Sequence, residues 1–451
     1  MCCSTTNPVS TPIRQNRSLD AKLHSIRTNL GGAKDFILAD AKDADMAAGL
    51  AATGKDARTG KIRSLAEYRD QMREIVKQGL VDIMLMSANS SEALAIKEKL
   101  FENSTVTPAA RANDTTDIHL MAGSSFAAEP SRPFRSATIE QIQSGKVNPT
   151  DAERRLGADL GLYSMTPNNR LEFDYPTIEA YKQFRIEAES KGFRHFLEIF
   201  DPNACGDKCP ADLGRYVNDL IARTLAGVPS SGRPVFLKIA YHGPRAMEEL
   251  VAYDPSLVAG ILGGSSGTTH DAFKLLEDAK KYGARAALFG RKINNSEHAL
   301  TFVQFLHQIA NGRIGAAEAV KAYHGELEKL KIKPYRAIKD DLELTVTESS
   351  YAGGSGAAAA KAVGNNVAQA AKFRVTESMV SGGATKPAPQ KPSTVEKTKV
   401  IANAMIAKPM AGIPTLANGS PDFKTMTAAQ KVAYSRGRIQ ADLTRVNGDG
   451  R

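Results

Sequence analysis

The stretch Pro234-Val-Phe-Leu-Lys-Ile-Ala-Tyr241 is a short apolar run with a single charged residue, Lys238, near its centre. Gly232 precedes the run and Gly243 follows it, and glycine commonly marks the end of a regular element. Such a run is typical of a β-strand that is buried on both faces. Burial disfavours the charged ammonium form of a lysine, and a neutral amine attacks carbonyl carbon. Lys238 is therefore a candidate Schiff-base nucleophile; the alternative is a structural lysine that pairs with a buried carboxylate or reaches the strand end.

Composition favours a soluble globular chain that binds anions. The 451 residues carry a net charge of +10, with 42% hydrophobic and 24% charged residues. A phosphate-binding enzyme accounts for this basic charge as well as a nucleic-acid binder does. Tryptophan is absent and aromatic residues make up 6%, which leaves few rings for stacking bases, so we expect no nucleic-acid partner. The sequence shows no apolar run as long as a membrane span and no apolar signal core at its start.

The cysteines favour a reducing compartment. Four of them, Cys2, Cys3, Cys205 and Cys209, are too few for a disulfide framework in a chain of this length. Cys205 and Cys209 lack a second pair of ligands with zinc spacing, so we expect incidental thiols in a loop. The sequence therefore predicts a cytoplasmic protein that uses neither a metal nor another cofactor.

Strand-like and helix-like patterns alternate over residues 34–335. The strand-like runs are Phe36–Asp40, Val81–Ser87, Thr116–Ala122, Asp159–Met165, His195–Phe200, Val235–Tyr241, Leu257–Leu262 and Ala284–Phe289. Eight short strands that alternate with helices predict an α/β fold, the closed parallel (β/α)8 TIM barrel. The rival is an open doubly wound sheet, but no G-x-G-x-x-G follows the first strand.

Both ends of the chain differ from this region. Residues 1–33 form a polar amino-terminal arm with a short helix near Leu19–Thr28. Residues 336–451 form a flexible, low-complexity tail that ends in a basic amphipathic helix over Thr427–Val446. A helix of this kind on a tether can dock on a protein partner, which makes a tail-mediated partner a second expectation. Residues 123–150 are expected to be a long loop with one short helix.

Candidate acid–base groups lie at the carboxyl ends of strands, where barrel active sites are found. Asp40 ends the first strand, and Glu198 and Lys238 lie in the fifth and sixth. Glu198 can act in proton transfer or serve only as the structural partner of Lys238. Three charged neighbours compete with Asp40 for its role: Lys42, Asp43 and Asp45.

Glycine-bearing turns follow the seventh and eighth predicted strands. Glycine lets backbone N–H groups approach an anion, and phosphate binding after the last two strands recurs in this fold. The alternative is a pair of ordinary turns. The candidate phosphate-binding residues are Gly263, Gly264, Ser265, Gly290 and Arg291.

These motifs resemble those of class I aldolases of the archaeal-type fructose-bisphosphate group and the neighbouring tagatose-bisphosphate and sulfofructose-phosphate aldolases. Leu237-Lys238-Ile-Ala-Tyr-His-Gly243 is similar to the Schiff-base strand of that family. The other matching stretches are the glycine turn at Gly263-Gly264, Phe289-Gly290-Arg291, Leu197-Glu198-Ile199 and Leu38-Ala-Asp40. The resemblance covers roughly residues 34–312. It departs from the family at Phe200-Asp201, where the archaeal-type group has a tyrosine, and at Ala41-Lys42.

The resemblance implies a metal-independent Schiff-base aldolase that cleaves or forms a C–C bond in a phosphorylated ketose. Lys238 is the implied nucleophile, and Glu198 or Asp40 the implied acid–base group. A homo-oligomer is also implied. The alternative function is a non-catalytic barrel that binds a phosphorylated ligand and acts as a sensor or assembly component through its tail.

Overall fold

The computed structural model describes residues 17–30, 32–56, 59–264 and 267–346, together with residues 414, 422, 425–427 and 430. The chain divides into two compact units, Met1–Val375 and Thr376–Arg451, and the first contains every element discussed below. The amphipathic helix expected over residues 427–446 lies almost entirely outside the described residues, so it stays a prediction.

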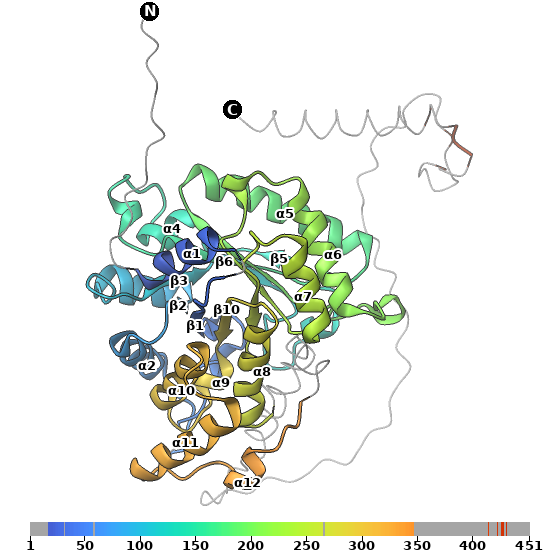
Figure 1. Cartoon of the computed structure of the whole chain (residues 1–451). Helices are drawn as coiled ribbons and strands as arrows, with labels where there is room; N and C mark the ends of the chain where they lie inside the picture. The colour runs from blue at the N-terminus through green and yellow to red at the C-terminus, as the bar shows by residue number, and fades with distance from the viewer. Residues whose placement is uncertain are drawn as a thin grey trace, which may run out of the picture. The chain divides into compact units, whose positions relative to one another are not determined.

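Eight parallel strands close into a ring, which confirms the predicted TIM barrel (Figure 1). Around the ring the order is β1, β2, β3, β6, β7, β8, β9, β10 and back to β1. The open doubly wound sheet is excluded because β1 pairs with both β2 and β10. The strands are β1 (Ile37–Lys42), β2 (Ile83–Met86), β3 (Thr107–Arg111), β6 (Leu160–Met165), β7 (Arg194–Ile199), β8 (Leu237–Ile239), β9 (Gly260–Leu262) and β10 (Ala286–Phe289).

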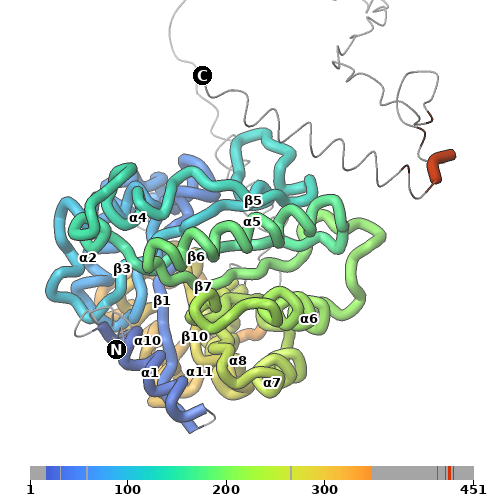
Figure 2. Tube along the Cα trace, turned by 90° about the horizontal axis from the view of Figure 1, so that it is seen from above, coloured from blue at the N-terminus to red at the C-terminus, as the bar shows by residue number. Residues whose placement is uncertain are grey.

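Helices surround the ring. The longer ones are α2 (Leu65–Gln78), α5 (Leu171–Ser190), α6 (Leu213–Ala226), α7 (Gly243–Tyr253), α8 (Thr269–Lys281), α10 (Ala299–Ala310) and α11 (Ala316–Lys329). The short ones are α3 (Ala88–Ser91), which continues into a π-helical turn over Glu92–Lys97, α4 (Ile139–Ser144), α9 (Arg291–Asn294) and α12 (Ile338–Asp341). In Figure 2, α6 lies beside α7, and α8, α10 and α11 form another group. No helix among the described residues is long and apolar enough to cross a bilayer.

Local sequence explains where these helices begin and end. Helix α2 starts at a capping box, in which Ser64 and Glu67 each accept the other's backbone N–H, and it stops at Gly79 in the left-handed conformation. The same device opens α8, where Thr268 and Asp271 form the box.

The predicted third strand is wrong. Residues 116–122 form turns, and the third barrel strand is β3 at Thr107–Arg111. Before the turns, β4 (Asp114–Thr115) pairs antiparallel with β5 (Pro133–Phe134). The strand signal of β3 is weak because β3 contains Pro108, and proline is depleted from the interior of a sheet.

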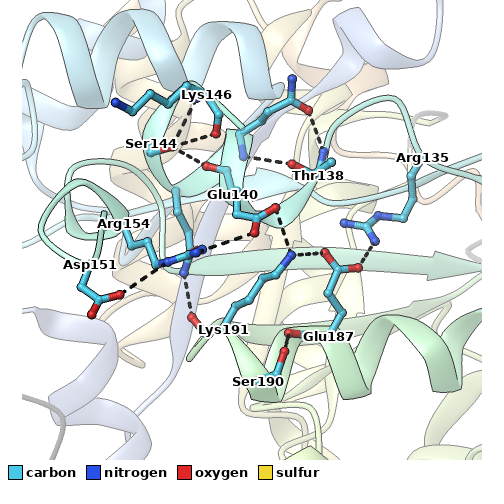
Figure 3. Close-up of polar contacts among 12 residues, drawn as sticks. Arg135, Thr138, Glu140, Ser144, Lys146, Asp151, Arg154, Glu187, Ser190 and Lys191 are labelled. Carbon is cyan, nitrogen blue, oxygen red and sulfur yellow. Dashed lines mark hydrogen bonds and ion pairs between the residues drawn. The ribbon is translucent and has the colours of Figure 1, made fainter. Parts of the chain in front are cut away.

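The segment between β3 and β6 contains α4, the expected short helix. Figure 3 shows how ion pairs join it to the end of α5: Lys191 Nζ lies 3.0 Å from Glu140 Oε2 and 3.0 Å from Glu187 Oε1. Arg135 also donates to Glu187 at 2.5 Å. Single exposed pairs contribute about 0–1 kcal/mol, but together these contacts fix the segment against the barrel wall.

Helix α1 (Ser18–Thr28) closes the amino-terminal end of the barrel. Its buried residues Leu19, Leu23 and Ile26 belong to the same cluster as the side chains that fill the ring. Lys22 Nζ donates to Phe36 O at 2.8 Å, and Arg17 donates to Val106 O at 2.7 Å. This part of the amino-terminal arm is therefore packed against the barrel.

The packed chain also continues past residue 335, where the tail was expected to begin. Residues 338–346, here called the strap, lie along the start of α8. Asp341 Oδ1 accepts the backbone N–H of Thr269 at 2.8 Å, and Asp271 Oδ1 accepts that of Thr345 at 2.9 Å. The tail boundary expected at residue 336 is thus too early, because the strap satisfies polar groups of the helix.

The expectation of free thiols at Cys205 and Cys209 is also wrong, because the structure joins them in a disulfide. A single helical turn, Gly206–Lys208, separates them and brings their Cα atoms to 4.8 Å. That spacing lies within the range that a disulfide spans.

Candidate active site

A cavity of about 610 Å³ opens at the carboxyl ends of the strands. Its polar lining includes Asp43, Arg111, Glu198 and Lys238, which come from different strands or the loops after them. This is the end of the barrel where enzymes of this fold place their active sites.

Lys238 points into the barrel. Its neighbours Leu237 and Ile239 pack in the outer layer, whereas Phe236 belongs to the interior cluster, so strand alternation turns Lys238 inward. The side chain is buried, with 6% of the residue exposed. Its Nζ lies 2.6 Å from Oε1 of Glu198, the residue directly opposite it on β7. The candidate nucleophile therefore has a buried carboxylate as its partner.

Alternating charges extend from this pair across the cavity floor. Glu198 Oε2 accepts a hydrogen bond from Ser164 Oγ at 2.6 Å and lies 3.4 Å from Arg111 Nη2. Arg111 Nε donates to Asp43 Oδ2 at 2.6 Å. Burial would raise the pKa of Asp43, but the charges of Arg111 and Lys238 lower it below its ordinary value. Asp43 is therefore held ionised.

The structure does not bring Asp40 to this group. Ile37 and Ala39 face the barrel interior, so Asp40 and Lys42 face the helices. The Asp40 Oδ2 and Lys42 Nζ atoms are 3.5 Å apart, and both side chains have 0% exposure. Burial raises the pKa of Asp40 to about 6 and lowers the pKa of Lys42.

Lys42 Nζ also lies 5.8 Å from the ring centroid of Tyr68 on α2, which places the pair between strand and helix. Asp40 does not line the cavity, and Asp43 does. The predicted role of Asp40 assumed the wrong face of the strand. Odd-numbered residues of β1 face inward, and Asp43, just after the strand, lies on that same face.

Four of the predicted phosphate-binding residues line the cavity: Gly263, Gly264, Gly290 and Arg291. Ser265 lies outside the described residues. Gly264 has φ +60° with open space at its Cβ position, and a Cβ on Gly290 would lie 2.5 Å from Ala41 O. Both sites need glycine, one for its backbone conformation and the other for the close approach of β10 to β1.

Arg291 is a cation that lines this cavity. Within the described part of the chain it forms no ion pair and no hydrogen bond through its side chain. Burial lowers the pKa of its guanidinium, and the carboxylates of Glu198 and Asp43 oppose that shift. An arginine stays charged under these conditions, and its planar donors suit a phosphate group.

Comparisons with known proteins agree with this barrel. The chain matches no family model. Over 93 residues it is 36% identical to 2-amino-3,7-dideoxy-D-threo-hept-6-ulosonate synthase 1 of Archaeoglobus fulgidus, a match over 20% of this chain and 34% of that protein. The matched stretch thus spans about a third of that curated relative.

Among solved structures, the fructose-bisphosphate aldolase from Slackia heliotrinireducens aligns over 70% of this chain and 94% of its own, with a TM-score of 0.50 and 15% identity. An archaeal fructose-1,6-bisphosphate aldolase, determined with its catalytic Lys covalently bound to the carbinolamine intermediate of the substrate, aligns over 64% and 100% with a TM-score of 0.48 and 14% identity. The resemblance to aldolases is thus confirmed for the barrel fold. At these identities the structural likeness shows the fold alone.

Sequence reasoning missed Arg111 and passed over Asp43 within this aldolase-like barrel. Arg111 ends the run Val106-Thr-Pro-Ala-Ala-Arg111, the same signal that singled out Asp40, but this run was not among the predicted strands. Asp43 could have been chosen by counting the inward positions Ile37 and Ala39 forward along the chain.

Proposed function

We propose that this protein is a metal-independent aldolase that forms a Schiff base between Lys238 and the ketone of a phosphorylated ketose. The observation that carries the proposal is the buried contact of 2.6 Å between Lys238 Nζ and Glu198 Oε1 at the floor of the cavity. A carboxylate at that distance can accept the ammonium proton and release a nucleophilic amine. The curated relative and the aldolase barrels described above support the same class of chemistry.

The reaction follows from these positions. The free amine of Lys238 adds to the ketone carbon, and loss of water gives an iminium ion. A carboxylate then takes the proton of the C4 hydroxyl, the C3–C4 bond breaks, and its electron pair passes to the iminium as an enamine. Protonation at C3 and hydrolysis release the ketone fragment and the lysine. General acid–base help of this kind contributes about 10²–10⁴-fold.

Glu198 and Asp43 take the two carboxylate roles in this proposal. Glu198 contacts Lys238 directly, so it exchanges protons with the amine. Asp43 stays ionised because of its bond to Arg111, and it is the carboxylate available to the C4 hydroxyl. Asp43 thereby replaces the sequence-based candidate Asp40.

The cavity also has the charge that a phosphorylated substrate needs. Two carboxylates and four cations line it, and among the described residues neither Arg291 nor Lys55 forms a direct ion pair. Backbone N–H groups at Gly264 and Gly290 would add neutral donors for the phosphate oxygens. We propose that the substrate phosphate binds beside Arg291, Gly264 and Gly290.

Borohydride reduction in the presence of dihydroxyacetone phosphate tests the proposal. Wild-type protein should gain the mass of the reduced adduct on the peptide that contains Lys238, and Lys238→Met should gain none. Lys42→Met is the matched control, since it removes another buried lysine that lies outside the cavity, and it should still form the adduct. Glu198→Gln should slow adduct formation by about 10²–10⁴-fold.

One observation favours the second candidate, a non-catalytic barrel that binds a phosphorylated ligand. Lys238 Nζ lies 2.6 Å from Glu198 Oε1, and a buried lysine paired with a carboxylate in this way can have a purely structural role. Phosphate-dependent binding of dihydroxyacetone phosphate without any reduced adduct would support this candidate and reject the aldolase. Three sequence-based predictions stay predictions whichever function holds: a homo-oligomer, a cytoplasmic location and a tail-mediated partner.

A further inference from the structure

The chain returns to the mouth of the cavity after its last long helix. Helix α11 ends at Lys329, and Lys331 adopts φ +56°, a left-handed conformation that changes the direction of the chain. Ile332 then packs against the main core, and the side chain of Tyr335 lines the cavity. The site therefore receives a side chain from beyond residues 34–312, the region that resembles the aldolases.

Glu297 holds the backbone of Tyr335 in place. Its Oε1 accepts the N–H of Tyr335 at 2.8 Å, and its Oε2 accepts the hydroxyl of Tyr323 at 3.0 Å. Tyr323 lies on α11 and has 0% exposure, so Glu297 joins Tyr335 to the packed core. On the other side of Tyr335, the strap begins at residue 338 and is bound to α8. Tyr335 is thus anchored in both directions along the chain.

Helix α9 presents one face to the cavity beside this anchor. Arg291 begins the helix, and Asn294 and Asn295 lie at its end; all three line the cavity. Residues three and four apart lie on the same side of a helix, and four residues span about 6 Å along its axis. Glu297 follows this face by two residues. One short face therefore leads from the proposed phosphate ligand Arg291 to the anchor of Tyr335.

The hairpin after β1 borders the same rim. Arg63 Nη1 donates to Asn294 O at 3.3 Å and to Thr53 O at 3.2 Å, so it fastens the hairpin to α9. Lys55 of this hairpin lines the cavity. Burial and the charge of Glu297 raise the pKa of Tyr335, and the charge of nearby Arg63 opposes them. The Tyr335 hydroxyl therefore stays protonated at neutral pH and can donate a hydrogen bond.

This rim offers donors that nothing else engages. Among the described residues, Tyr335 forms no hydrogen bond through its hydroxyl, and Lys55 forms no ion pair. The two carboxylates that line the cavity, Asp43 and Glu198, are already bound to cations of the floor. A ligand at the rim thus meets positive charge and O–H and N–H donors, which are the groups that bind phosphate oxygens.

We propose that Tyr335 is a specificity-determining residue whose hydroxyl donates a hydrogen bond to the same substrate phosphate that Arg291 binds. Glu297 is its positioning residue. This assignment rests on the proposed aldolase function and adds a phosphate-binding group to it. Because a hydrogen bond to a charged group is stronger than one to a neutral group, loss of the hydroxyl affects phosphorylated ligands selectively.

Calorimetric binding of dihydroxyacetone phosphate to the full-length protein tests this assignment. Tyr335→Phe should weaken binding about tenfold or more, the factor that a hydrogen bond to a charged group gives. Tyr253→Phe is the matched control and should bind as wild type does, because Tyr253 lies on α7, is 63% exposed against 55% for Tyr335, and does not line the cavity. Unchanged binding in Tyr335→Phe, or no binding by wild type, would overturn the assignment.

Borohydride trapping shows whether the effect depends on the phosphate. Tyr335→Phe should raise the half-saturating concentration of dihydroxyacetone phosphate about tenfold and leave the limiting rate of adduct formation unchanged. With unphosphorylated dihydroxyacetone, neither quantity should change. A structural role would alter the response to both ketones alike, and that result would reject phosphate recognition by Tyr335.

A double variant tests the positioning role of Glu297. Glutamine at this position has one acceptor oxygen in place of two, so Glu297→Gln leaves either Tyr335 or Tyr323 without its acceptor. Glu297→Gln/Tyr335→Phe should bind dihydroxyacetone phosphate no more weakly than Tyr335→Phe alone. Additive losses would reject Glu297 as a positioning residue. Tyr335→Phe changes an exposed side chain, so its result stands even where the Glu297 variant does not fold.

The two readouts separate this assignment from the aldolase proposal. If Tyr335→Phe weakens binding but no adduct forms on Lys238 of the wild type, the aldolase fails and the assignment of Tyr335 holds for a non-catalytic barrel. If wild type and Tyr335→Phe form the adduct with the same dependence on dihydroxyacetone phosphate concentration, the aldolase stands and the assignment of Tyr335 is wrong.

Discussion

Arg111→Met should destabilise the protein more than any other single change at the cavity floor. Arg111 is 4% exposed and lies between two carboxylates, 2.6 Å from Asp43 Oδ2 and 3.4 Å from Glu198 Oε2. Methionine keeps most of the length but removes the charge. Removal of one member of a buried ion pair typically costs about 3–5 kcal/mol, because the remaining charge is left uncompensated. That is a large part of an ordinary stability of about 5–15 kcal/mol.

The size of this loss should depend on pH. In the wild type the pKa of Asp43 lies below 3.8, so its contribution to stability is present above that value and is lost only as the pH falls through the lowered pKa. In Arg111→Met, burial acts on Asp43 without its main opposing charge, and its pKa should rise. The variant then gains stability as acidification protonates Asp43, and the difference from wild type shrinks.

Urea unfolding followed by far-ultraviolet circular dichroism measures this effect, since the chain has no tryptophan for fluorescence. The double variant Arg111→Met/Asp43→Asn serves as the control, because it removes the stranded charge and should recover part of the loss. A loss below about 1 kcal/mol at neutral pH, or no recovery in the double variant, would refute the account of buried alternating charges.

Three other predictions concern residues around the cavity. Asp40→Asn should leave the cleavage rate of a ketose phosphate nearly unchanged, whereas Asp43→Asn should lower it about 10²-fold or more, because Asp43 is the proposed base for the C4 hydroxyl; equal effects of the two variants in a cleavage assay would contradict the assignment. Burial lowers the pKa of Lys292 to about 8 from 10.5, so the folded state holds this proton less tightly than the unfolded chain, and wild type should gain stability over Lys292→Met as the pH rises above about 8. Urea midpoints at several pH values test this, and a constant difference would argue against it. Deletion of residues 337–451 should lower the urea midpoint, because several strap hydrogen bonds of about 1 kcal/mol each are lost; deletion of residues 347–451 is the control and should not.

The barrel and its lysine strand could be predicted because their signals are local. The run around Lys238 combines apolar residues, glycine boundaries and one charge, and the helices carry capping boxes and glycine stops that act within a few residues. Tertiary packing has little influence on where these elements begin and end. These are the features for which sequence and structure agree.

The cavity floor could not be predicted in full because its pairs join distant parts of the chain. Arg111 is 68 residues from Asp43 and 87 from Glu198, and no local pattern marks such partners. Pro108 weakens the strand signal of β3, which carries Arg111. Asp40 was chosen for its place at a strand end, but the direction of its side chain, set by the interior packing of Ala39, keeps it out of the cavity, which Asp43 lines.

Helix α1 has a consequence for the order in which the chain assembles. Its buried residues belong to one core cluster with residues of strands as distant in the sequence as β1 and β10, and the helix is synthesised before all of these strands. Helix α1 must therefore wait for strands that are made much later before it finds its place, so its docking would mark a late step of folding. A probe at its exposed face would report ring closure during biosynthesis.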